Sequence, residues 1–276
     1  MPLIGSGLIQ AANTFVGAYD AIPSIAAAYS TRRLLSSYTG PLLRLVADRT
    51  GYPEQDIGYT AAGDLNTAAA ASFLAGDAGY IAKWYDQSGN ALHWSQATLA
   101  SMPLFVVSGQ NSRPIIRADG TDDHMLSPSF AAMSSETIIA VVKWSTVGNK
   151  SLMGRDPLLR MYGGPMDYIV ASGWADGVNG IRSATTFGTN FGILTGARTV
   201  SGNSITLWKN SSTVLETNTI TQSSVASVRV LFRREIAAND EPMDGDLGEL
   251  IICNAALSTA NRNAAESAAN AYWSAY

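Results

Sequence analysis

Short apolar runs, each followed by turn residues, fill most of the chain after residue 80. Such runs occupy residues 80–85, 104–107, 114–118, 137–142, 158–162, 168–171, 205–208, 228–232 and 247–253. Turn signals separate them, for example Ser88-Gly89-Asn90, Gly163-Gly164-Pro165 and Asp176-Gly177. Many short strands with frequent turns are typical of a sandwich or barrel. The sequence therefore predicts a mostly β fold.

Three stretches have helical features instead. Ser24 can cap a helix that has Leu34, Leu35 and Tyr38 on its apolar side and stops at Gly40-Pro41. A second short helix is expected from Asp64 to Leu74, and an alanine-rich C-terminal helix over 259–272 follows Ser258. Residues 1–23 are expected to form an arm or a first strand, and residues 24–276 one domain.

Composition narrows the class of protein. Charged residues make up 14% of the chain, against about 25% in a typical soluble domain, and the net charge is −4. Basic residues pair only at 32–33 and 233–234, so nucleic-acid binding is not expected. The chain has no apolar run long enough for a membrane span, and no Lys or Arg precedes Arg32, so we expect neither a membrane protein nor a signal peptide. The single cysteine, Cys253, is expected in the core.

Two segments indicate the class of protein more specifically than the composition does. They are AAYSTRRLLSSYTGPL at 27–42 and Trp84-Tyr85-Asp86-Gln87-Ser88-Gly89-Asn90. Both resemble the catalytic domain of the α-L-arabinofuranosidase B family. Further on, residues 119–123 and 244–250 resemble laminin-G-like or concanavalin A-like lectin domains, of the kind found in bacteriophage virion proteins. The resemblance implies a concanavalin-like jelly-roll sandwich of two antiparallel sheets, with short N-terminal helices and a C-terminal helix.

The catalytic residues of that family are harder to find. A retaining glycosidase needs two carboxylates about 5–5.5 Å apart. The resemblance implies a nucleophilic Glu in a Gly-Asn-Ala-Glu-Thr segment after two adjacent cysteines, and this chain has neither; residues 151–164 offer only Asp156. The family's acid/base Asp precedes a Gly-x-x-x-Glu segment. Gly245 and Glu249 fit that spacing, which leaves Asp240, out of register by about two residues, as a weak catalytic candidate.

Other residues are candidates for binding. Trp94, Trp144 and Trp174 could stack on sugar rings, and Asp119, Asp122 and Asp123 could hold Ca²⁺, which prefers oxygen ligands. A second acidic run, at positions 240, 241, 244 and 246, is a similar metal candidate. No other cofactor is expected. The 84–90 segment is interpreted as a turn that defines the fold, since Asp side chains accept backbone N–H bonds there.

These features together favour a non-enzymatic role. We expect a structural protein of the bacteriophage virion, a capsid decoration protein or a tail-fibre component, that contacts major capsid or tail proteins. It would form a homo-oligomer, most readily a trimer, and its lectin-like domain could bind a host-surface glycan. The alternatives are an arabinofuranosidase-like glycoside hydrolase and a stand-alone carbohydrate-binding module.

Overall fold

The computed structural model describes residues 15–154, 158–161, 165–169, 180–199, 201, 204–211, 213–219, 226–235 and 241–276. The first half of the chain forms strands β1 (Ile25–Ser30), β2 (Leu43–Ala47), β3 (Glu54–Ile57), β4 (Gly79–Trp84), β5 (Trp94–Ser95), β6 (Leu104–Val106), β7 (Ile115–Asp119), β8 (Met125–Phe130) and β9 (Ser135–Trp144). The second half forms β10 (Lys150–Gly154), β11 (Leu158–Met161), β12 (Pro165–Ile169), β13 (Gly180–Thr186), β14 (Gly192–Thr199), β15 (Ser204–Lys209), β16 (Thr213–Thr219), β17 (Ser227–Leu231) and β18 (Asp244–Cys253). Two helices, α1 (Thr67–Leu74) and α2 (Thr259–Trp273), and two 3₁₀ turns, Leu99–Ser101 and Gln110–Ser112, complete the described elements.

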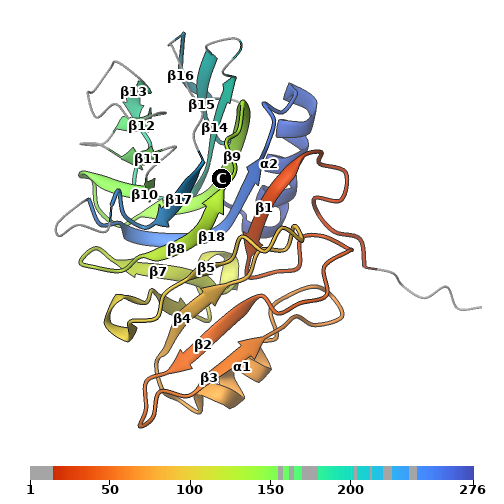
Figure 1. The fold of residues 1–276 in the computed structure, drawn as a ribbon, viewed down its shortest axis with the longest axis vertical. Helices are drawn as coiled ribbons and strands as arrows, with labels where there is room; N and C mark the ends of the chain where they lie inside the picture. Colours follow the sequence, from red (N-terminus) through yellow and green to blue (C-terminus); the bar gives the residue numbers. More distant parts are fainter. Residues whose placement is uncertain are drawn as a thin grey trace, which may run out of the picture.

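The strands form two antiparallel layers that curl around a common core (Figure 1). One layer runs β16–β15–β14–β9–β18–β1, and the other runs β13–β12–β11–β10–β17–β8–β5–β4–β2–β3. Strands β6 and β7 join the layers, because β6 pairs with β4 and β7 pairs with β18. The predicted mostly β jelly-roll fold is confirmed.

The longest apolar strands, β9 and β18, lie side by side in the middle of the first layer. Ile138, Ala140 and Val142 of β9 face the core between the layers, whereas Ile139 and Val141 face a second core on the outer side. Both faces of these strands are therefore buried, which explains why their sequences are nearly continuous apolar runs.

Helix α2 covers that outer face. Its Ala265, Ala269 and Trp273 pack into the second core. The Ser258 side chain accepts a hydrogen bond from the backbone N–H of Asn261 (3.2 Å), so the predicted N-cap and C-terminal helix are confirmed. The predicted short helix is α1, which Asn66 caps. No described helix is long and apolar enough to cross a bilayer.

The helix expected after Ser24 is wrong. Residues 25–30 form β1, which pairs along β18, and Ser24 itself has a left-handed backbone (φ 59°). Alanines favour a helix in isolation, but tertiary contacts override this preference. Here the strand buries Ala27, Ala28 and Tyr29 completely. It also pairs with the backbone along the edge of β18, which a helix could not do.

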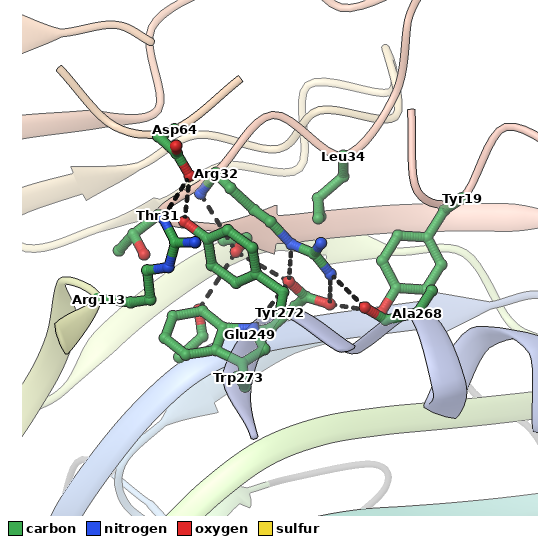
Figure 2. A network of polar contacts seen from close by, with 12 residues as sticks. Tyr19, Thr31, Arg32, Leu34, Asp64, Arg113, Glu249, Ala268, Tyr272 and Trp273 are labelled. Carbon is green, nitrogen blue, oxygen red and sulfur yellow. Dashed lines mark hydrogen bonds and ion pairs between the residues drawn. The ribbon is translucent and has the colours of Figure 1, made fainter. Parts of the chain in front are cut away.

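The carboxylate of Glu249, in β18, fastens the N-terminal part of the chain to this framework (Figure 2). Arg32 contacts both of its oxygens, through Nε (2.9 Å) and Nη2 (3.1 Å). The Trp273 indole N–H (3.1 Å) and the Ser30 hydroxyl (3.0 Å) also donate to it, as does the Tyr19 hydroxyl. Glu249 is only 1% exposed, so these donors replace the water that an ionised carboxylate needs.

A second group of polar contacts lies beside the Glu249 carboxylate (Figure 2). The Tyr272 ring is stacked between the guanidinium groups of Arg32 (4.3 Å) and Arg113 (4.2 Å). Asp64 accepts hydrogen bonds from Arg113 (2.9 Å) and from the Tyr272 hydroxyl (2.8 Å). The loop before α1, the loop before β7 and the end of α2 are thereby held together.

Replacing Glu249 with Gln should destabilise the protein by about 3–5 kcal/mol, because the change leaves Arg32 buried without its counter-charge. Urea unfolding followed by tryptophan fluorescence measures this. Glu54→Gln is the control: its ion pair with Arg44 is long (3.8 Å) and exposed, so the change should be within about 0.5 kcal/mol of wild type. Equal effects of the two substitutions would contradict this role of Glu249.

Candidate functional site

The Trp84–Asn90 segment forms the turn that its sequence predicts. Asp86 accepts hydrogen bonds from the backbone N–H groups of Ala28 (3.0 Å), Ser88 (2.9 Å) and Leu92 (3.1 Å). The Gln87 side chain accepts from the N–H of Leu34 (2.7 Å) and donates to the carbonyl of Arg32 (2.9 Å). Both side chains are about 1% exposed. The motif therefore joins β4 to the N-terminal strand through the side chains of Asp86 and Gln87.

The tryptophans proposed as sugar-stacking platforms are not on the surface. Trp94 and Trp144 are 0% exposed, with Trp94 packed against Tyr29 and Trp144 against Phe187 (ring centroids 5.9 and 5.2 Å apart). Stacking on a sugar needs an accessible ring face, so their burial argues against this role. Both belong to the apolar core because they alternate inward along their strands. Trp174 lies outside the described residues.

The predicted acidic group is brought together by the turn between β7 and β8. One carboxylate oxygen from each of Asp119, Asp122 and Asp123 lies within 4.8 Å of the others. Asp123 accepts from the Asp119 backbone N–H (2.9 Å), and Ser101 donates to Asp122 (3.0 Å). Burial, with the Asp119 carboxylate nearby, raises the pKa of Asp123 to about 7. Ca²⁺ at this group stays a prediction.

The second acidic run does not form one cluster in its described part. Asp246 makes a bidentate ion pair with Arg117 (2.6 and 3.0 Å), and Asp244 accepts from the Thr146 hydroxyl (3.2 Å). Glu241 instead pairs with Arg234 (3.3 Å). Asp240 lies outside the described residues, so its catalytic assignment stays a prediction.

The two segments to which the family resemblance would assign catalytic carboxylates lie next to each other. Ser151, in β10, donates its backbone N–H to the Glu241 carbonyl (3.0 Å) and its hydroxyl to the Glu241 carboxylate (2.9 Å). Arg234 lies on the other carboxylate oxygen. The Glu241 side chain is 11% exposed, so it is largely shielded but not sealed from solvent. A carboxylate oriented in this way can serve in acid–base or nucleophilic chemistry.

The backbone around Glu241 is strained. Glu241 has φ 52° and the buried Phe232 has φ 67°, a left-handed conformation that is rare for such residues and is often found at functional sites. Phe232 donates to the Leu152 carbonyl and accepts from Met243 (both 2.8 Å), which holds the two segments in place. A Cβ on Gly154 would lie 2.0 Å from the Arg234 carbonyl oxygen, so only glycine fits. From the sequence, Glu241 was expected only in a metal-binding acidic run, and the signal for its place here was its neighbour Asp240.

Comparisons with known proteins agree with the family resemblance. Residues 16–118 match the family model described as "Alpha-L-arabinofuranosidase B, catalytic". A probable α-L-arabinofuranosidase B from Aspergillus terreus is 36% identical over 96 residues, which is 34% of this chain and 19% of that protein. The matched stretch thus spans about a fifth of the relative.

Solved structures share the fold over a longer range. An arabinofuranosidase complexed with arabinofuranosyl-α-1,2-xylobiose has a TM-score of 0.73 at 15% identity, covering 91% of this chain and 63% of that one. The binding domain of Paraclostridial Mosquitocidal Protein 1 has a TM-score of 0.54 at 15% identity, covering 69% of this chain and 50% of that one. At these identities the similarity shows the fold alone.

These findings correct the functional expectation. The expected structural protein of the bacteriophage virion, located in the particle, is wrong, because the family model and the curated relative are those of an arabinofuranosidase. The expectation that the chain is not an enzyme is overturned by the same matches. The missing nucleophile segment argued against an enzyme, whereas the scaffold motifs at 27–42 and 84–90 were those of the catalytic domain.

Asp123 should make stability depend on pH. Its folded pKa lies above the unfolded value of about 4, so the folded state holds the extra proton, and stability present below pH 4 is lost as the pH rises to about 7. Asp123→Asn should remove this loss, so the free-energy difference between variant and wild type should change by about 1–3 kcal/mol between pH 4 and pH 8.

Chemical unfolding at a series of pH values measures this difference. Asp56→Asn is the control, since Arg44 lowers the pKa of Asp56 and its effect should have the opposite sign. If the predicted Ca²⁺ binds, millimolar calcium at pH 8 should stabilise the wild type but not Asp123→Asn. A pH-independent difference for Asp123→Asn would show that this carboxyl is not perturbed.

Proposed function

We propose that this chain is a glycoside hydrolase domain of the α-L-arabinofuranosidase type, which removes L-arabinofuranosyl groups from a glycan. The observation that carries the proposal is the match of residues 16–118 to a catalytic-domain family. A likeness in fold to an arabinofuranosidase over 91% of the chain is consistent with it. The matched stretch supplies the scaffold: β1, the 84–90 turn and the strands that carry them.

The reacting carboxylates belong to the rest of the chain. Hydrolysis with retention needs a nucleophile and an acid/base about 5–5.5 Å apart, and inversion needs roughly 6.5–9.5 Å. We assign Glu241 to this pair because Ser151 and Arg234 hold its carboxylate where β10 meets the segment before β18. Asp240, adjacent in sequence, and Asp156, two residues after β10, are the candidates for its partner.

Ser151 and Arg234 have separate roles in this proposal. The Ser151 hydroxyl donates to Oε2 and therefore orients the carboxylate. The Arg234 guanidinium lies 3.3 Å from Oε1 and stabilises negative charge on it. The family's Gly-Asn-Ala-Glu-Thr segment and adjacent cysteines are missing, so the pair is proposed in a different local sequence.

The test is release of 4-nitrophenol from 4-nitrophenyl α-L-arabinofuranoside. Glu241→Gln should lower kcat by at least about 100-fold with an unchanged thermal melt, because the amide keeps the shape but cannot transfer a proton or attack. Asp240→Asn and Asp156→Asn identify the partner, since one of them should show a similar loss. Asp56→Asn, in the exposed β3 strand, is the control and should keep full activity.

Two results would contradict the proposal. One is a wild-type protein that is folded but does not hydrolyse this substrate or arabinose-substituted xylan. The other is a Glu241→Gln variant that keeps wild-type activity, which would move the reaction away from this place.

A further inference from the structure

His93, in the loop between β4 and β5, is a hydrogen-bond acceptor in the folded protein. Its Nδ1 accepts from the backbone N–H of Asp86 (3.0 Å). Only a neutral imidazole with its proton on Nε2 has a lone pair at Nδ1. An imidazolium carries an N–H at both ring nitrogens, so turning the ring over does not restore an acceptor. Protonation of His93 is therefore incompatible with this hydrogen bond.

The hydrogen bond from Asp86 belongs to a buried turn that holds the N-terminal strand. Asp86 is 1% exposed, and a shielded N–H that loses its acceptor destabilises the fold. Its carboxylate accepts from the backbone N–H of Ala28, in β1. The Gln87 side chain binds the backbone of residues 32–34. Loss of the His93 acceptor would thus act on the connection between the 84–90 turn and the N-terminal segment.

The groups around His93 favour the neutral ring. Burial has the largest effect and lowers the pKa of His93; the Asp86 carboxylate raises this pKa and the Lys83 ammonium lowers it further. The net result is a pKa below the usual value for histidine. The Tyr85 ring meets the imidazole edge-on, with centroids 5.0 Å apart. Burial raises the pKa of Tyr85 to about 12 and that of the nearby Tyr38 as well, so neither phenol is charged near neutral pH.

We propose that His93 is an acid-sensitive latch, whose neutral imidazole holds the 84–90 turn against β1 and whose protonation releases the turn. The stabilisation from the neutral ring is present above the unfolded pKa of about 6.5 and is lost as the pH falls through the lower folded pKa. This sign is opposite to that of Asp123. The release is local, because the contacts around Glu249 hold the same segment through groups other than histidine. The latch does not depend on the proposed hydrolase activity.

The experiment is amide hydrogen exchange followed by mass spectrometry at pH 7.5 and pH 5.0, with the rates corrected for the intrinsic effect of pH. Protection of a peptide that covers residues 84–92 should fall by about fivefold or more at pH 5.0, because protonation favours the open turn. His93→Asn should abolish this fall, since its Oδ1 can accept from Asp86 but does not titrate.

His124, the other histidine of the chain, supplies the matched control. Its Nδ1 contacts the Asp122 carbonyl, outside the 84–90 turn. His124→Asn should therefore keep the wild-type loss of protection at residues 84–92. Equal protection of wild type at the two pH values would overturn the proposal. So would a His93→Asn variant that still loses protection in acid, because another group would then be responsible.

A second measurement uses the wild-type protein. The Cε1–H resonance of His93, distinguished from that of His124 by the His124→Asn spectrum, reports the protonation of the imidazole. Its midpoint should coincide with the pH at which residues 84–92 lose protection. A ring that titrates while the peptide stays protected would contradict the latch, even if His93→Asn does not fold.

Discussion

The buried carboxylate of Glu249 depends on three segments that are far apart in the sequence. An ionised group at 1% exposure is stable only when donors surround it, and here the donors come from residues 19–32 and from Trp273 of α2. None of these partners is local to Glu249. These contacts therefore require the N-terminal segment, the central strand β18 and the C-terminal helix to assemble together. The second core, which lies between these elements, forms only when they do.

The 84–90 turn repeats this arrangement with different chemistry. Asp86 and Gln87 use their side chains to hold the backbone of residues 28–34, where β1 ends. Two contacts therefore hold β1 and the residues just after it in place. One is the ion pair of Arg32 with Glu249, and the other is the hydrogen bond from Ala28 to the 84–90 turn. Since these are the segments that carry the family resemblance, the match at 16–118 reflects a shared scaffold.

The candidate site lies in the part of the chain outside the family match. Ser151, Arg234 and Glu241 come from β10, the segment after β17 and the segment before β18. Strain at Phe232 and Glu241 is tolerated because hydrogen bonds between the segments over-determine the backbone. One fold can carry different reacting residues in different proteins.

Several features of this protein follow from the sequence alone. Periodic apolar runs predicted the β fold, Ser258 predicted the start of α2, and the 84–90 motif predicted its own turn, since each depends on contacts within a few residues. The strand at 25–30, the burial of Trp94 and Trp144, the raised pKa of Asp123 and the orientation of Glu241 were decided by tertiary structure. These depend on burial and on which distant strand or side chain lies alongside, and a local pattern of residues contains no information about such surroundings.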